Sequence, residues 1–294
     1  MKLIMLSGLP ASGKSTRAKE IVEQGNWVRV NRDLLREMLH FGEYSGRHEG
    51  VVVDAEKILV KSLLLDGQNV VIDDCNLNPK NKEMWSSIAK AMEASFESKF
   101  VDTDYFQCLK RDILRGDKEI GRDVITRMAL QYGLYPKPAK GFVLCDLDGT
   151  LADVRHRLGF VRPEYFKGPG DFVKSWKDFF ENLGGDTMRH EVLSQVVARQ
   201  DDGYEIILVS ARPEKYKKET EKWLSDYPQL RYKCIIMRKD NDKRPDTDIK
   251  QQIYDTYFKG KYPIHCIFDD RPVVIRMWKS NGLDVVDVGG GVEF

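Results

Sequence analysis

The sequence of 294 residues has few of the features that mark secreted, membrane or zinc-stabilised proteins. Its five cysteines are widely spaced, odd in number and without a CxxC pair, which argues against structural zinc and indicates a reducing compartment. No run approaches the ~18 apolar residues of a membrane span. The opening apolar run meets Gly8 too early to be a signal peptide. We therefore expect a soluble, cytoplasmic protein with no membrane partner.

An excess of charge of either sign is also missing. Lysine plus arginine number 47 and aspartate plus glutamate 46, for a formal net charge of +1. A protein that coats nucleic acid without specificity is strongly basic, because its affinity comes from many phosphate contacts. Any nucleic-acid partner of this chain must therefore be bound locally.

Short β-rich runs alternate with longer helical patterns, which is typical of parallel sheets with crossover helices. The length indicates two domains, and the proline- and glycine-containing segment 133–141 is the expected linker. We predict an α/β fold in domain 1–136 and again in domain 137–294. The expected strands are 3–6, 27–30, 69–72 and 96–101, followed by 142–145, 205–209, 232–237, 264–268 and 284–288.

The segment Gly8 to Ser15 fits the phosphate-loop pattern GxxxxGK[ST], and it follows a strand and precedes a helical stretch. In such a loop backbone N–H groups surround phosphates, Lys14 supplies a positive charge and the Ser15 hydroxyl can reach magnesium. We expect ATP and Mg²⁺ as cofactors. The expected nucleotide-binding residues are Gly8, Ser12, Gly13, Lys14, Ser15 and Thr16.

Asp33 is the candidate base of this half. It follows the strand 27–30, at the edge where parallel strands gather ligands, and a carboxylate there can accept a proton from an attacking hydroxyl. The alternative is that Asp33 caps a helix beginning at Leu34. Arg36 lies one helical turn later and can hold an acceptor phosphate at the same edge.

Further charged residues follow in the first half. Asp73 and Asp74 come at the end of the strand 69–72, and either can hold magnesium or orient a basic residue. Arg111, Arg115 and Arg122 are typical of a mobile lid that folds over phosphates, although at least one of the three is more simply a solvated surface residue.

The second half begins with the acidic turn Asp146-Leu-Asp-Gly-Thr150 after the apolar strand 142–145. This turn matches the DxDGT signature of the haloacid dehalogenase superfamily of phosphatases, which the second half resembles. Ser210, Lys250 and Asp269-Asp270 follow in the order that the superfamily uses, at a strand end, on a helix and at another strand end.

Each of these residue types has a chemical purpose in phosphate transfer. Asp146 is the expected nucleophile, while Asp148 protonates the leaving oxygen and later activates water. Asp146, the Asp148 backbone carbonyl and Asp269 or Asp270 would supply oxygen ligands to Mg²⁺. Ser210 and Lys250 would hold the oxygens of the transferring group.

A segment rich in aromatic residues, about 152–187, is expected to form a small cap over this site. An aromatic ring there can stack on a base, whereas most of these rings are expected to form the core of the cap itself. Arg157 and Arg212 each lie shortly after an active-site strand and are expected to bind substrate phosphate.

Taken together, these motifs resemble the bacteriophage polynucleotide kinase 3′-phosphatase family over nearly all 294 residues. The corresponding kinase motifs are Gly8 to Ser15, Asn31 to Arg36, Asp74 to Pro79 and Arg111 to Gly116. The resemblance implies a P-loop kinase-like sheet with helices on both faces, followed by a haloacid dehalogenase-like Rossmannoid sheet with a cap insert. The sequence departs from the family at Cys75, where a hydroxyl residue is expected, and in the spacing of the cap.

The resemblance also assigns roles. In the first half it implies that Asp33 is the general base, Arg36 binds a 3′ phosphate of the acceptor, Asp74 orients Arg36 and Arg115 clamps ATP phosphate. In the second half it implies the nucleophile and acid–base roles already given, and its arginine falls on Arg157 instead of Arg155 if the spacing from Asp146 has no gap. The further essential positions that it implies are Ser210, Arg212, Lys250, Asp269 and Asp270.

We therefore expect a bifunctional end-healing enzyme that phosphorylates 5′-hydroxyl ends of DNA or RNA from ATP and removes 3′ phosphates through an aspartyl-phosphate. The expected partners are nucleic-acid termini and, functionally, a ligase; homo-oligomerisation is left open. One alternative is a metabolite kinase fused to a small-molecule phosphatase. Another is a nucleotide-gated binding protein with an inactive phosphatase half.

Overall fold

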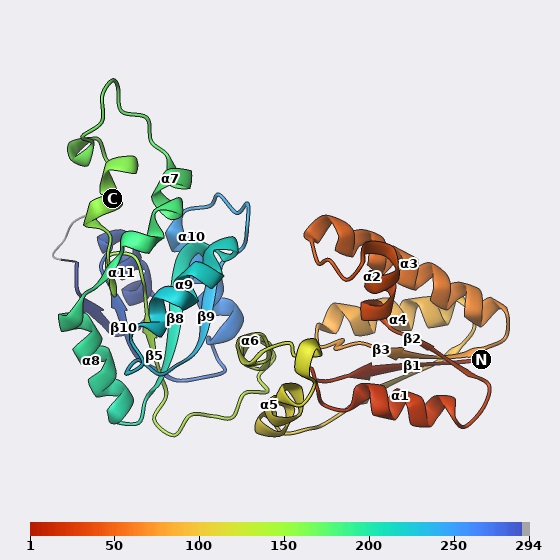
Figure 1. Ribbon diagram of the computed structural model, residues 1–294. Helices are drawn as coiled ribbons and strands as arrows, with labels where there is room; N and C mark the ends of the chain where they lie inside the picture. The colour runs from red at the N-terminus through yellow and green to blue at the C-terminus, as the bar shows by residue number, and fades with distance from the viewer. Residues whose placement is uncertain (290–294) are drawn as a thin grey trace. The chain divides into compact units, whose positions relative to one another are not determined.

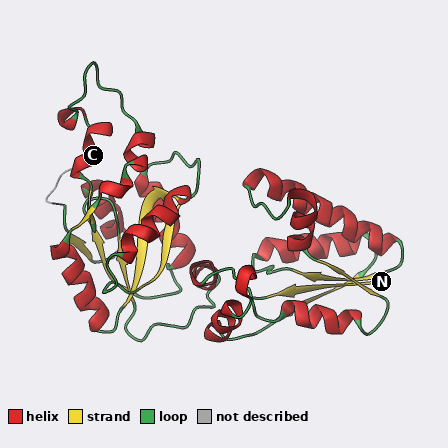
Figure 2. Cartoon of the chain, viewed as in Figure 1, coloured by secondary structure: helices red, strands yellow, loops and turns green. Residues whose placement is uncertain are grey.

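The computed structural model describes residues 1–289 and divides the chain into two compact units, Met1–Tyr132 and Gly133–Phe294 (Figure 1). Both units are α/β with a parallel main sheet, as the alternation of strand and helix patterns predicts (Figure 2). Each is described by itself below.

The first unit contains a four-stranded sheet in the order β2-β3-β1-β4. Because β1 and β3 are neighbours and β2 is next to β3, the loops that follow these three strands meet at one edge of the sheet. The elements of the unit are β1 Lys2–Ser7, α1 Lys14–Val22, β2 Trp27–Val30, α2 Arg32–His40, α3 Gly46–Leu65, β3 Asn69–Asp73, α4 Pro79–Ala91, β4 Ser95–Phe100, α5 Tyr105–Ile113, η1 Gly116–Lys118 and α6 Arg122–Gln131.

Alternation along β1 covers both faces of this sheet. Leu3 and Met5 belong to a buried cluster formed with α2, α3 and α4, whereas Ile4 and Leu6 pack in a second cluster with α1. Successive side chains of a strand point to opposite faces, so one apolar strand serves both layers. The helices α2 to α4 and the helix α1 accordingly lie on opposite faces of the sheet (Figure 1).

The second unit contains a five-stranded sheet in the order β11-β10-β5-β8-β9 and a small antiparallel pair of β6 with β7. The strand β5 lies between β10 and β8, so the residues that follow it are flanked by the ends of both. The elements are β5 Phe142–Cys145, β6 Ala152–Asp153, η2 Arg155–Phe160, η3 Pro163–Tyr165, α7 Trp176–Glu181, η4 Leu183–Gly185, β7 Thr187–Met188, α8 His190–Asp201, β8 Glu205–Pro213, η5 Glu214–Tyr216, α9 Lys217–Ser225, β9 Tyr232–Arg238, α10 Asp246–Tyr257, β10 Ile264–Asp269, α11 Pro272–Ser280 and β11 Val285–Asp287.

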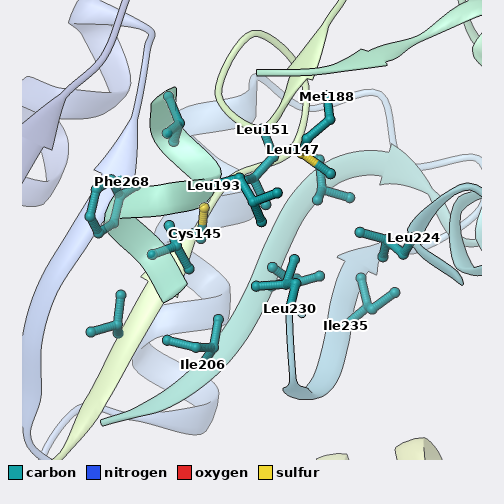
Figure 3. Packing of buried hydrophobic residues seen from close by; sticks show 14 of the residues in the cluster. Cys145, Leu147, Leu151, Met188, Leu193, Ile206, Leu224, Leu230, Ile235 and Phe268 are labelled. Carbon is teal, nitrogen blue, oxygen red and sulfur yellow. The ribbon is translucent and has the colours of Figure 1, made fainter. Parts of the chain in front are cut away.

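One buried cluster fills the space between this sheet and the helices α8 and α9 (Figure 3). Cys145, Ile206 and Phe268 reach it from the sheet, and Leu193 and Leu224 reach it from the two helices. Leu147, within the acidic turn, and Leu151, directly after it, belong to the same cluster. The turn that carries the chemistry is therefore anchored by apolar residues within its own sequence.

The strand and helix predictions agree closely with the structure. Strands 27–30 and 142–145 have the expected bounds, and the other expected strands differ by a few residues at their ends. Asn78 caps α4 through its side chain, with Pro79 at the first helical position. The expected domain boundary, after residue 136, falls later than the division at Gly133, and Tyr135 lies in the second unit, where its backbone N–H donates to the Tyr262 hydroxyl at 3.0 Å.

Among residues 1–289, every helix is either too short or too polar to cross a bilayer.

Leu208→Ala tests the packing of the second unit. Leu208 is fully buried in β8, so removing its side chain leaves a cavity, and we expect the stability of the unit to fall by ~2–5 kcal/mol. Pulse proteolysis in urea, with cleavage mapped to residues 133–289, measures the change. Leu65→Ala, at a position 76% exposed on α3, is the matched control and is expected to leave stability nearly unchanged. Equal losses in the two variants would contradict the packing described here.

Candidate functional sites

The phosphate loop joins β1 to α1, and two glycines allow its shape. Gly8 has a φ of +150°, and a Cβ there would lie 2.9 Å from both the Ser12 hydroxyl and the Val101 carbonyl, so a side chain does not fit. Gly13 has a φ of +100° and immediately precedes the first turn of α1. The free N–H groups of that turn consequently face the loop, as anion binding requires.

Lys14 is buried and folded over this loop. Its ammonium donates to the backbone carbonyls of Leu9 at 2.7 Å and Gly8 at 3.1 Å. Ser15 and Thr16 are exposed at the beginning of α1, while Ser12 is buried. Six of the seven predicted nucleotide-binding residues thus lie on one loop and one helical turn, with a lysine charge inside it, whereas the seventh, Arg115, follows α5.

Asp33 and Arg36 lie together on α2, on the edge that the phosphate loop shares. The Asp33 side chain is 78% exposed and accepts a hydrogen bond from Arg36 at 2.6 Å. The residue that caps α2 is Asn31, whose side chain accepts from the Leu34 N–H, so the interpretation of Asp33 as the cap is wrong. Asp33 does not cap the helix, and its exposed carboxylate is accessible from solvent.

The expected pairing of Asp74 with Arg36 is not what the structure contains. Arg36 forms a two-pronged contact with Glu49, at 3.0 and 3.1 Å, in addition to its bond with Asp33. Asp74 instead accepts from the backbone N–H of Arg32 at 2.9 Å. The register of α3 against α2 brings Glu49 to Arg36, and sequence spacing alone does not show this.

The two aspartates at the end of β3 have separate partners. Asp73 is buried and accepts two hydrogen bonds from Arg29, at 2.5 and 2.8 Å. Asp74 faces the first turn of α2 through Arg32 and Asn31. Asp74 is therefore the one beside Asp33 and Arg36, while Asp73 ties β3 to β2.

Glu56 is a fully buried acid beneath this edge that the sequence predictions missed. Its Oε2 accepts from Arg32 at 2.6 and 3.0 Å, but among residues 1–289 neither Glu56 Oε1 nor Asp74 Oδ2 has a hydrogen-bond donor. Burial, reinforced by Asp74, raises the pKa of Glu56 to about 9 against the opposing effect of Arg32. A proton on Glu56 would provide the missing donor, and the raised pKa favours this neutral form.

A sequence signal for Glu56 does exist. It lies in the buried stripe Val52, Glu56, Val60 and Leu64 of α3, at helical spacing. A lone acid in an apolar stripe is expensive to bury unless it is paired or protonated, so it marks a structural or functional contact.

The predicted lid arginines have different surroundings. Arg111 on α5 donates to the Ser12 carbonyl of the phosphate loop at 3.1 Å, and Thr103 donates to the same oxygen at 2.8 Å. Arg115 is 39% exposed and contacts Asp112, while Arg122 is exposed at the beginning of α6. Arg111 is thus bonded to the loop itself, and the assignment of Arg115 to ATP phosphate stays a prediction.

The second site surrounds Asp146, at the end of the central strand β5. One oxygen each of Asp146, Asp269 and Asp270 lies within 4.8 Å of the other two, and all three residues are buried. The glycine of the acidic turn, Gly149, has a φ of +82°, and a Cβ there would overlap the Asp270 carboxylate. A Gly at this position lets Asp270 approach the turn, where its Oδ1 accepts from Thr150 at 3.0 Å.

Lys250 supplies the positive charge nearest to these carboxylates. It extends from α10, is buried, and its ammonium lies 3.0 Å from Asp146 and 2.7 Å from Asp269. Burial raises the pKa of Asp146 well above its usual range, Asp269 and Asp270 add to this, and Lys250 opposes it. Burial and the neighbouring carboxylates also raise the pKa of Asp270 to about 7.

The donor set fits a hard divalent cation. Three buried carboxylates with one lysine repel one another, and oxygen atoms are the ligands that Mg²⁺ takes in proteins. Asp146, Asp269 and Asp270 are the residues whose side chains would hold it; the sequence predicts Asp146 with Asp269 or Asp270, and the backbone carbonyl of Asp148 as a further ligand. Asp148 is outside this side-chain group because its carboxylate is held by arginines.

Arg157 and Arg212 are not open phosphate receptors but buried partners of Asp148. Arg212 donates to Asp148 Oδ1 at 2.6 and 2.9 Å, and Arg157 donates to the same oxygen. Burial alone would raise the pKa of Asp148, but the two guanidinium groups hold it well below its usual range. The choice of Arg157 over Arg155 agrees with this geometry, because Arg155 is exposed and pairs with Asp153.

Asp186, another residue that the sequence predictions missed, holds both arginines from behind. Its fully buried carboxylate accepts from Arg157 at 2.6 and 2.7 Å and from Arg212 at 2.8 Å. Phe179 packs against Arg157, with the guanidinium carbon 4.0 Å from the ring centre. Asp186 comes directly before β7, at the end of the cap, and its distance from Asp148 in the sequence conceals the contact.

Ser210 is fully buried within β8, and its hydroxyl accepts from the Arg212 N–H at 3.2 Å. The strand order places β8 beside β5, so Ser210 and Asp146 come from adjacent strands. The sequence set Asp146, Asp148, Ser210, Lys250, Asp269 and Asp270 therefore lies at the carboxyl edge of three neighbouring strands, with Lys250 reaching it from α10.

Glu56→Gln tests the proton assigned to the buried acid. Its pKa is raised from an ordinary 4.5 to about 9, so between these values the folded chain keeps a proton that the unfolded chain releases. The resulting stability is complete below about 4.5 and is lost as pH rises toward 9, with a slope of at most about 1.4 kcal/mol per pH unit. We expect Glu56→Gln to flatten this decline in pulse proteolysis mapped to residues 1–132.

Asp54→Asn makes the same chemical change on the solvent side of α3, where the side chain is 71% exposed. It is expected to keep the slope of the unaltered chain. If Glu56→Gln also keeps that slope, Glu56 does not carry the proton.

Comparisons with known proteins agree with the two-unit division. Residues 174–292 match the model of the family described as polynucleotide kinase PNKP phosphatase domain, and residues 3–134 match the model described as AAA domain. The first match includes Ser210, Arg212, Lys250, Asp269 and Asp270 but begins after the acidic turn.

Similar proteins were found at low identity. A protein of Autographa californica nuclear polyhedrosis virus with the provisional name bifunctional polynucleotide kinase/RNA ligase is 27% identical over 95% of this chain and 41% of its own length. The L-seryl-tRNA(Sec) kinase of Methanococcus maripaludis is 30% identical over 54% of this chain and 61% of its own length. This chain thus spans less than two thirds of the length of either relative.

A chain in a solved structure of the Pnkp1/Rnl/Hen1 RNA repair complex is 26% identical, with a TM-score of 0.42, and the match covers 99% of this chain and 96% of that one. The sequence matches and the geometry agree on the fold class. The first unit has the P-loop kinase type of fold, and the second has the haloacid dehalogenase type.

Proposed function

We propose that this chain is a bifunctional nucleic-acid end-healing enzyme. Its first unit transfers the γ-phosphate of ATP to 5′-hydroxyl ends of DNA or RNA, and its second unit hydrolyses 3′-phosphate ends. The observation that carries the proposal is the match of residues 174–292 to a polynucleotide kinase phosphatase domain, over a segment that holds five of the buried site residues. The phosphate-loop unit in the same chain then supplies the complementary activity.

In the first unit the proposed chemistry is transfer to a hydroxyl. The phosphate loop and Lys14 bind the phosphates of ATP, and Mg²⁺, when bound beside Ser15, offsets their charge. Asp33 is exposed at the same edge and takes the proton of the attacking hydroxyl. Arg36, held by Glu49, keeps a guanidinium beside Asp33, where it can bind a phosphate of the acceptor strand.

In the second unit the proposed chemistry passes through Asp146. Asp146, Asp269 and Asp270 would hold Mg²⁺, which would reduce the repulsion between phosphate and Asp146. A carboxylate oxygen of Asp146 forms the bond to phosphorus, and the 3′ oxygen leaves and takes a proton from Asp148. Asp148 then removes a proton from the water that hydrolyses the aspartyl-phosphate. Lys250 and Ser210 hold the phosphate oxygens in both steps.

The arginines give Asp148 a specific constraint. As a carboxylate bonded to Arg157 and Arg212 it is in the form required for activating water. To protonate the leaving oxygen, Asp148 must itself carry a proton. In that step one of the arginines must therefore shift part of its hydrogen bonding from Asp148 to the substrate. Asp186 makes this exchange possible because it keeps both guanidinium groups in place while their bonds to Asp148 change.

Label transfer from ATP tests the proposed function. We expect γ-phosphate to appear on a 5′-hydroxyl oligonucleotide in preference to sugars and nucleosides, and phosphate to be released from a matched 3′-phosphate oligonucleotide. Matched DNA and RNA ends measure the preference between the two polymers. Transfer to metabolites without transfer to the oligonucleotide would support a metabolite kinase fused to a small-molecule phosphatase. ATP binding with neither reaction would support a nucleotide-gated binding protein.

Lys14→Ala and Asp146→Asn test whether the two sites are separate. Each change removes a group used in only one reaction, so we expect a loss of ~10³-fold or more in that reaction and little change in the other. Both reactions are measured in both variants. In each variant, the reaction that is expected to persist is the control for folding. Loss of both activities in either folded variant would contradict separate sites.

Asp186→Asn tests the buried arginine clamp. Without this carboxylate, both guanidinium charges act on Asp148 alone and their positions are less fixed, so we expect kcat for 3′-phosphate hydrolysis to fall roughly tenfold to a hundredfold. Kinase activity should not change. Asp153→Asn, which breaks the exposed pair with Arg155 in the same cap, is the control and should leave kcat nearly unaltered.

A further inference from the structure

The second site opens into a cleft of about 630 Å³, within the ordinary range of ligand pockets of ~300–1,000 Å³. Asp146, Asp148 and Lys250 line it at the catalytic end. The remainder of its wall extends beyond the residues that handle phosphate. This part of the cleft has the room and the chemistry for another portion of the substrate.

Three aromatic side chains of the cap and the adjoining turn form one wall. The Trp176 and Phe180 rings are stacked at 6.0 Å with an angle of 24° between planes, and the Phe180 and Tyr216 rings are 5.7 Å apart at 31°. All three residues line the cleft, and Trp176 is 42% exposed. They place ring surface beside the catalytic carboxylates, and the ammonium of Lys174 lies 4.8 Å from the centre of the Trp176 ring, where a base that stacks on this ring would displace it.

The other cap aromatics are used differently. Phe179 is buried in the core of the cap, where it packs against Arg157, and the Phe166 and Phe172 rings pack edge to face at 5.8 Å. Neither Phe166 nor Phe172 is among the residues that line the cleft. Phe179 also lines the cleft and packs edge to face against Trp176 at 5.5 Å and Phe180 at 5.3 Å, so this ring belongs both to the core of the cap and to the base of the wall.

The segment 238–245, between β9 and α10, also lines the cleft and carries mixed charges. Arg238 is bonded to Asp246, and Arg244 pairs with Asp242 at 2.5 Å, so these guanidinium groups are already balanced. Lys243 is exposed on this segment, and Lys215 is exposed beside Tyr216. These ammonium groups suit a flexible, charged chain better than a fixed small ligand.

We propose that Trp176, with Phe180 and Tyr216 behind it, is the stacking platform for the base of the terminal nucleotide whose 3′ phosphate enters the site. The inference rests on the proposed function and specifies its substrate: an unpaired 3′-terminal nucleotide of a single strand. A base has a flat face that stacks on aromatic rings, and its phosphate reaches Asp146 from the same cleft. A base held against Trp176 is not paired, so recessed ends within a duplex are poorer substrates.

Terminal bases provide the test. In the unaltered full-length chain, replacing the terminal nucleotide of a 3′-phosphate oligonucleotide by an abasic one should raise KM about tenfold or more, with a smaller effect on kcat. Trp176→Ala should raise KM for the normal end by a similar factor. In this variant the KM values for normal and abasic ends should be the same. Trp176→Phe keeps a ring and should recover most of the loss.

Tyr165→Ala is the matched control, since Tyr165 is 43% exposed in the same cap and does not line the cleft. It should behave as the unaltered chain. The inference would be overturned if Trp176→Ala kept the KM of the unaltered chain. It would also be overturned if the variant raised KM by the same factor for normal and abasic ends, so that the difference between them persisted. The proposed function would stand in both cases. Failure of the unaltered chain to hydrolyse any 3′-phosphate end would overturn both.

Discussion

The second unit depends on the balance of charge at the end of β5. Asp146, Asp269 and Asp270 are buried together, with one ammonium group, that of Lys250, among them. Burial of so many like charges is unfavourable, which is why the pKa of Asp146 is raised and why the set suits a divalent cation. Asp148 lies close to this group but is balanced by two arginines and Asp186. The pKa values of two neighbouring carboxylates in one short turn are therefore shifted in opposite directions, up for Asp146 and down for Asp148.

The first unit also contains buried acidic side chains near its candidate site, and their charge is balanced in a different way. Glu56 lies beneath the edge that carries Asp33 and Arg36, and its raised pKa leaves a neutral carboxyl where a second charge beside Asp74 would be costly. Arg32 joins these two acids, while Glu49 fixes Arg36. Asp33 is left at the surface with a single arginine contact. In both units the buried acidic side chains near the candidate site have arginine or lysine partners or a raised pKa.

The parts that sequence predicts well are those in which the chemistry is local. The phosphate loop, the acidic turn and the strands that precede them are contiguous, so Lys14 and Asp146 follow the expected strands, Lys250 lies on the expected helix and the two final aspartates lie at a strand end. The sequence predicts Ser210 at a strand end, but β8 continues to Pro213. The partners of these residues are not local. Two of these partners, Glu49 and Glu56, reach their arginines because of the register of α3 against α2. Asp186 reaches Arg157 from the residue before β7, at the end of the cap. Both arrangements depend on tertiary packing. The same reason explains why Arg36 is held by Glu49 instead of Asp74, and why the sequence does not show the contacts of Arg157 and Arg212 with Asp148; that these two arginines bind substrate phosphate stays a prediction.

The aromatic residues of the cap have two kinds of surroundings. Phe179 is needed inside the cap, because it covers the guanidinium of Arg157 and so helps to exclude water from the Asp148 network. Trp176 and Phe180, on the same short helix α7, face the cleft. In the proposed complex, the outer rings of this helix would contact the terminal base, while Phe179 packs against Arg157, a partner of Asp148. Binding of the correct end can thereby influence the geometry of Asp148 through one element, which relates recognition of a terminus to the step that requires Asp148 to gain and lose a proton.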